Sequence, residues 1–152
     1  MAEFIHGNQS IHYELAGVRE FRLRTPVLLL HGNGEDMHIF DNMIAPLLGA
    51  KGFVLMDSRM QGESFSLDGG GEISYSAMAD DAAALMDELG INEYDIVGYS
   101  DGGIIALLMA MKSFKVRRFF TIGANTDPSG LTAKAVREIK TALRRANHKG
   151  DE

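Results

Sequence analysis

The sequence contains no cysteine. It therefore has no disulfide framework, no thiolate nucleophile and no thiolate metal site. It also lacks an excess of basic residues, since its formal net charge is -6 at pH 7 and its isoelectric point is near 5.3. This balance argues against nucleic acid or an anionic membrane as the main partner.

Long apolar runs are absent as well. The N-terminus has neither the basic nor the long apolar region of a signal peptide, and no stretch is apolar over the length needed to cross a bilayer. The chain shows no internal repeat and no low-complexity segment. Its 152 residues suffice for one domain with one core. We expect a single cytoplasmic domain over residues 1–152.

Two kinds of hydrophobic periodicity alternate along the chain. Short alternating runs at 3–6 and 10–16 predict an antiparallel hairpin. Apolar runs typical of strands buried on both faces occur at 27–30, 53–56, 95–97 and 116–122. Segments with helical spacing lie at 39–48, 76–89, 104–113 and 132–146. In the first of them, the predicted buried stripe is Ile39, Phe40, Met43, Ile44, Leu47 and Leu48.

This order of elements predicts an α/β fold, with a mostly parallel sheet, an N-terminal antiparallel hairpin and helices on both faces. Ligands of such sheets bind beyond the carboxyl ends of the strands. Polar and glycine-rich residues follow those ends at 31–34, 57, 100 and 123–125. We therefore expect them to share one rim, and no comparable grouping marks the opposite rim. The polar loop 57–72 is long, which is typical of functional loops.

The segment 94–110 joins a short strand to a helix through Gly98-Tyr99-Ser100-Asp101-Gly102. A strand that turns at once into a helix, with serine at the corner and glycine two positions to either side, fits the G-x-S-x-G nucleophile elbow. A strained corner leaves no room for a Cβ at Gly98 or Gly102. The positive N-terminus of the helix would face the Ser100 hydroxyl, which suits a developing oxyanion.

Other interpretations of these residues stay open. Ser100 also fits the ordinary N-cap of a βα turn. The turn partly fits a dinucleotide-binding loop, but Ser100 occupies the middle glycine position and the loop lies far from the N-terminus. His31, Asp36 and His38 are close in sequence, but no further metal ligands are evident, so we expect no metal site. We expect no cofactor.

Three motifs, in this order, resemble the N-terminal half of the α/β-hydrolase family. The run LLLHGNG at 28–34 resembles that family's apolar strand and HG loop. The run DSRMQGES at 57–64 resembles its D-x-R-G-x-G-x-S loop, with Met60 in place of the usual glycine. The elbow at Ser100 follows, and HYELAG at 12–17 is similar to the family's second strand.

The resemblance implies a serine hydrolase, like a carboxylesterase or lipase, that acts on a small-molecule acyl substrate. Ser100 would be the nucleophile, and a serine there excludes the relatives that open epoxides with an aspartate. The backbone N–H groups of Asn33 and Asp101 would form the oxyanion hole. His31 would shape the loop beside that hole and would not act as the base. The residues with a structural role near the site would be His31, Gly32, Gly34, Gly98, Tyr99 and Gly102.

The acid and the histidine of a triad are not evident. In this family they follow the serine in the chain, and here the only later histidine is His148, in a polar tail with Asp151. We interpret both as solvated, while Asp127 is a candidate for the acid. The sequence thus predicts an incomplete triad, with the serine present and the acid and histidine not evident, in a domain that is incomplete at its C-terminus. The alternative is a non-catalytic fragment that self-associates as a homo-oligomer through the edge strand Val116–Ile122.

Overall fold

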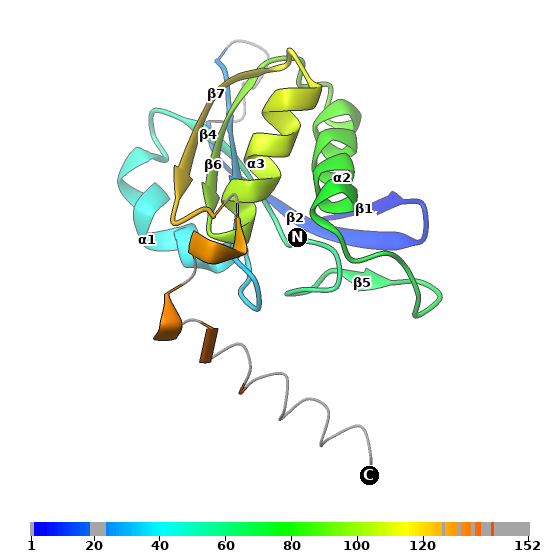
Figure 1. The fold of residues 1–152 in the computed structure, drawn as a ribbon. Coiled ribbons are helices and arrows are strands. Elements are labelled where there is room, and N and C mark those ends of the chain that lie inside the picture. Colours follow the sequence, from blue (N-terminus) through cyan, green and yellow to red (C-terminus); the bar gives the residue numbers. More distant parts are fainter. Residues whose placement is uncertain are drawn as a thin grey trace.

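A computed structural model describes residues 2–18, 24–125, 127–130, 132–134, 136–137 and 141. A mixed sheet forms its centre (Figure 1). The strands are β1 (Ala2–His6), β2 (Gln9–Gly17), β3 (Val27–Leu30), β4 (Gly52–Met56), β5 (Phe65–Ser66), β6 (Tyr94–Tyr99) and β7 (Val116–Ile122). Their order is β1-β2-β4-β3-β6-β7, with β5 paired to β2. Strands β3, β4, β6 and β7 are parallel, while β1 and β2 are antiparallel.

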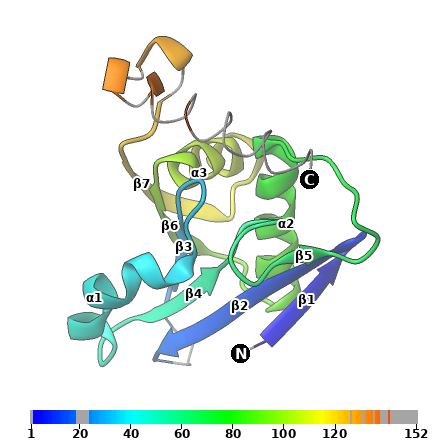
Figure 2. The ribbon, with the colours of Figure 1, turned by 90° about the horizontal axis from the view of Figure 1, so that it is seen from below.

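Helices cover both faces of this sheet, which confirms the predicted fold class (Figures 1 and 2). One face carries α2 (Tyr75–Glu88) and α3 (Asp101–Lys112). The other carries η1 (Met37–Phe40), α1 (Asp41–Ile44) and η2 (Ala45–Leu47). A further short helix, η3 (Pro128–Gly130), follows β7. Side chains alternate between the faces of a strand, so Leu28 and Leu30 pack in the α2/α3 core while Leu29 packs beneath α1.

The stripe predicted at 39–48 is only partly correct. Phe40 and Ile44 are buried as predicted, together with Met37, which the stripe did not include. Ile39, Met43, Leu47 and Leu48 are exposed. The segment folds as a 3₁₀ turn, one α turn and a second 3₁₀ turn that contains a proline near its start. Because 3₁₀ turns have three residues each, the 3.6-residue spacing assumed in the prediction does not hold here.

Helix α2 matches its predicted bounds closely, but its buried face contains a carboxylate that apolar periodicity did not indicate. Ser74 caps the helix by accepting a hydrogen bond from the Ala77 N–H at 3.2 Å. Asp81 is fully buried, and Arg59 donates to its two oxygens at 2.6 and 2.7 Å. The ring of His6 contacts Asp81 at 2.7 Å. This buried ion pair ties the loop after β4 to α2 and β1.

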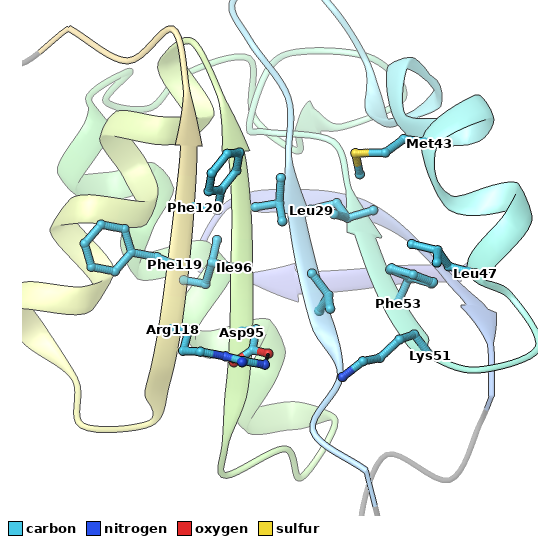
Figure 3. Close-up of a pocket in the computed structure, with 12 residues that line it drawn as sticks. Leu29, Met43, Leu47, Lys51, Phe53, Asp95, Ile96, Arg118, Phe119 and Phe120 are labelled. Atoms are coloured by element: carbon cyan, nitrogen blue, oxygen red, sulfur yellow. Dashed lines mark hydrogen bonds and ion pairs between the residues drawn. The ribbon is translucent and has the colours of Figure 1, made fainter.

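Strand β7 forms one edge of the sheet among the described strands. Beside it, α1 leaves part of its face of the sheet uncovered, and an apolar groove of about 470 Å³ lies there (Figure 3). Leu29 and Phe120 point into this space from β3 and β7, and Met43 and Leu47 border it from the α1 side. The groove lies along the strands, away from the carboxyl-end rim.

None of the helices in the described ranges has both the length and the apolar character that spanning a membrane requires. The cytoplasmic location stays a prediction. The helix predicted over 132–146 lies mostly outside the described residues, and His148 and Asp151 lie wholly outside them.

Candidate active site

Ser100 is the single residue between β6, which ends at Tyr99, and α3, which begins at Asp101. Its backbone has φ 52° and ψ −115°, a conformation that is strained for a residue with a side chain. Its N–H donates to the carbonyl of Ile122 at 2.7 Å, which fixes the corner to β7. The half-buried side chain makes no capping hydrogen bond. The interpretation of Ser100 as an ordinary N-cap is therefore wrong.

The two glycines that flank the corner allow helix and strands to touch. A Cβ on Gly98 would collide with the carbonyl of Gly102, and a Cβ on Gly102 would collide with the carbonyl of Leu30. The first turn of α3 thus rests directly on the backbones of β6 and β3. This is the steric reason that the sequence suggested for both glycines.

The loop after β3 lies against the same corner. A Cβ on Gly32 would be 3.1 Å from the Cβ of Ser100 and 3.2 Å from Cδ1 of Tyr99. The next residue, Asn33, is exposed, and its N–H has no acceptor among the described residues. The N–H of Asp101, at the first position of α3, has no intrahelical acceptor either. Within the described residues, the structure therefore places at one rim a hydroxyl and two amide donors for which no hydrogen-bond partner is present.

His31 holds this loop through both of its ring nitrogens and is buried. Its Nε2 accepts a hydrogen bond from the Ser58 N–H at 2.9 Å, so the proton is on Nδ1. That Nδ1 donates to the carbonyl of Gly32 at 2.7 Å. A ring engaged at both nitrogens has no free position for a substrate proton.

The loop 57–64 packs beside the loop of Asn33. The buried carboxylate of Asp57 accepts hydrogen bonds from the N–H groups of Met37 and Glu63, both at 2.8 Å. Met60 has φ 61°, the left-handed conformation that a glycine would adopt more easily. A side chain in that conformation costs about 1–2 kcal/mol. The methionine thus adopts a backbone conformation that suits glycine.

The carboxylate of Asp101 is paired with Tyr75, at the start of the neighbouring helix α2. Burial raises the pKa of Tyr75, and the charge of Asp101 and the hydrogen bond to its carboxylate raise it further. The neutral phenol therefore acts as a donor and holds the Asp101 side chain toward the start of α2.

The sequence model of the alpha/beta hydrolase fold family matches residues 25–145. The chain belongs to the α/β-hydrolase family. It is similar to a thermophilic esterase from Thermogutta terrifontis, with 25% identity and a TM-score of 0.72 over 93% of this chain and 50% of that one.

Two further solved structures share the fold at lower identity. Est816, described as an N-acyl homoserine lactone degrading enzyme, has 22% identity and a TM-score of 0.74 over 91% of this chain and 52% of that one. A proposed epoxide hydrolase from Pseudomonas aeruginosa has 24% identity and a TM-score of 0.70 over 79% of this chain and 39% of that one. The chain thus spans about half the length, or less, of these α/β-hydrolases.

No hydrogen bond joins Ser100 of this α/β-hydrolase to a histidine or a carboxylate within the described residues. The carboxylate of Asp127 accepts from the Ser129 N–H at 2.7 Å, and the hydrogen bonds to Ser129 lower its pKa. Asp127 therefore stabilises η3, and no described contact links it to Ser100.

The histidine and aspartate considered as metal ligands with His31 have other partners. Asp36 accepts from the His38 N–H at 2.9 Å, and the His38 ring contacts Asp41 at 3.2 Å. Within the described ranges, no three His, Asp or Glu side chains are grouped in a way that could hold a metal ion.

Proposed function

We propose that this chain is the nucleophile-bearing half of a serine acyl hydrolase that cleaves esters of small molecules. The observation that supports the proposal most is the Ser100 corner. A strained serine with a free hydroxyl lies beside a loop whose Asn33 N–H has no acceptor in the described part of the chain. The similarity to a thermophilic esterase, which spans 93% of this chain and 50% of the esterase, adds to that support.

In the proposed reaction, the Ser100 oxygen attacks the carbonyl carbon of the ester and its proton passes to a base. The carbonyl oxygen becomes an oxyanion that accepts hydrogen bonds from the N–H groups of Asn33 and Asp101. Collapse of this intermediate re-forms the carbonyl and breaks the bond to the alcohol, which takes the proton from the base. Water then cleaves the acyl-serine by the same steps, which releases the acid and restores the hydroxyl.

The base has to come from outside the described residues. All four described histidines are engaged elsewhere: His6 contacts Asp81, His12 lies near Glu63, His31 holds its loop and His38 contacts Asp41. Because the relatives are about twice as long, we place the base and its orienting acid in the remainder of the natural protein.

The test uses the full-length natural protein, a fluorophosphonate probe and p-nitrophenyl butyrate. We expect labelling of the wild type, and Ser100→Ala should abolish labelling and lower turnover by more than about a thousandfold. Ser113→Ala, at the other end of α3, is the matched control and should retain both. A folded wild type that takes up no label would refute the nucleophile assignment.

A second candidate function rests on a different observation. Among the described strands, β7 is an edge strand that exposes Phe119, Phe120 and Ile122, and the first two line the apolar groove. Unpaired strand edges with apolar side chains associate with other chains. A non-catalytic module that self-associates through β7 is therefore the second candidate, and a mass in solution that rises with concentration would distinguish it.

A further inference from the structure

The backbone amides on either side of Asn33 are both occupied by side-chain oxygens. The Gly32 N–H donates to Oε2 of Glu35 at 3.1 Å, and the Gly34 N–H donates to Oε1 of Gln61 at 2.7 Å. Between them, the Asn33 N–H has no acceptor among the described residues. Among the described residues, three consecutive donors are thus reduced to one free donor, in the loop whose Gly32 packs against Ser100.

The side chain of Gln61 starts from a fixed backbone. Its own N–H donates to the Ser58 carbonyl, and its carbonyl accepts from the Ser64 N–H, both at 3.0 Å. The hydroxyl of Ser64 in turn donates to the carbonyl of Asp57 at 2.8 Å and accepts from the His12 N–H at 2.9 Å. Gln61 itself is half-buried. Its amide oxygen therefore reaches Gly34 from a backbone that is already ordered, so only side-chain freedom is lost in making this bond.

We infer that Gln61 is a positioning residue for the oxyanion hole. By holding the Gly34 N–H, it fixes the peptide on the C-terminal side of Asn33. This contact restricts rotation of the Asn33 backbone, and so helps to orient the Asn33 N–H, which belongs to the preceding peptide, toward the substrate oxygen. Donors fixed before the reaction stabilise an oxyanion best because they need no reorganisation. This inference rests on the proposed function.

The test measures ester hydrolysis by the full-length protein together with inhibition by a trifluoromethyl ketone, which forms a tetrahedral adduct with serine. Gln61→Ala should lower kcat about tenfold with KM nearly unchanged, and should weaken the ketone by a similar factor, since only the charged tetrahedral state needs the oriented donor. Gln61→Glu, which keeps an acceptor oxygen at the same reach, should restore most of kcat. Glu63→Ala, in the same loop with an exposed side chain, is the matched control and should match the wild type.

If Gln61→Ala does not fold, Gln61→Asn replaces it, because its shorter amide cannot reach Gly34 although the residue stays polar. Unchanged kcat and ketone affinity in a folded Gln61→Ala or Gln61→Asn variant of an active enzyme would overturn this inference and leave the proposed function standing. A wild type that hydrolyses no ester and takes up no fluorophosphonate would overturn both. A loss confined to KM would also contradict the positioning role.

Discussion

Asp95 is a buried carboxylate at the amino end of β6, on the rim opposite Ser100. Arg118 and Arg117 donate to its two oxygens at distances from 2.7 to 3.2 Å (Figure 3 shows Arg118). The β6–β7 register shifts between Tyr94 and Asp95, so that Asp95 pairs with Arg118 while Arg117 is the extra residue of a bulge. The bulge allows two successive arginines to reach one carboxylate.

The pH dependence of stability should report this cluster. Burial raises the pKa of Asp95, but hydrogen bonds from Arg118 and Arg117 outweigh burial and lower the pKa to about 2. Since the folded pKa lies below the unfolded one, the stabilisation is complete above pH 4 to 5 and is lost as the pH falls toward about 2. It amounts to about 1–2 kcal/mol, because both arginines are partly solvated.

Urea unfolding of the wild type and Asp95→Asn at pH 7, 4 and 2.5 measures this contribution. The two proteins should differ most at pH 7, and the difference should be much smaller at pH 2.5, close to the folded pKa of Asp95. Taking the difference between the two proteins cancels the contribution of the other carboxylates. A difference that is the same at all three pH values would refute the ion-pair explanation.

Single residues were predictable where one residue type fits one local geometry. The serine at the strained corner and the two glycines beside it are of this kind, because the required backbone leaves few choices. Asp81 and Asp95 were not predictable, since the arginines that neutralise them lie 22 or more positions away in the sequence. The contact between Gln61 and Gly34, 27 positions apart, was missed for the same reason. The arginines that bind Asp95 form a polar cluster on the rim opposite Ser100, so the expectation that this rim carries no comparable grouping was wrong.

At the scale of elements, the position of α3 depends on its backbone contact with the strands. A Cβ on Gly102 would meet the backbone carbonyls of Leu30 and His31, neither of which can move without disturbing β3. We expect Gly102→Ala to destabilise the fold by more than about 3 kcal/mol or to prevent folding. Gly49→Ala is the matched control, because a Cβ there would meet nothing within 4 Å.

Urea midpoints of the two alanine variants test this contact. The free energy of unfolding of the Gly49→Ala control should lie within about 0.5 kcal/mol of the wild-type value. Gly102→Ala should show a much lower urea midpoint or no cooperative transition. Equal midpoints for the two variants would mean that α3 has room to shift away from β3.

The strands and α2 were predicted well because their periodicity is set by burial on one or two faces. The segment 37–47 was predicted less well because its helical turns change type within a few residues. The short strand β5 inside the loop 57–72 was missed, since two residues are too few to show any period. Local pattern thus predicts long elements with one environment and fails for short or mixed ones.

At the scale of the whole molecule, the described sheet has an unpaired edge strand and an uncovered part of one face on the same side. We expect the chain of 152 residues to self-associate there, with a mass that rises with concentration. Phe120→Asp should lower this association strongly, because Phe120 is 63% exposed and points into the groove. Leu67→Asp is the matched control, since Leu67 is 55% exposed but lies in the loop beside β2.

Sedimentation velocity over a range of protein concentrations tests whether the chain self-associates through β7. A monomer at every concentration, or an equal effect of both substitutions, would reject association through β7. If the chain associates but the full-length natural protein does not, a further segment of that protein covers this side, which removes the non-catalytic alternative.

The amides around the rim are held by the side chains of Glu35, Asp57 and Gln61, whereas the strands below are joined by main-chain hydrogen bonds. Most substitutions leave main-chain hydrogen bonds in place, but a single substitution at Glu35, Asp57 or Gln61 removes a side-chain hydrogen bond at the rim. Selection can therefore alter the chemistry of this molecule without rebuilding its scaffold.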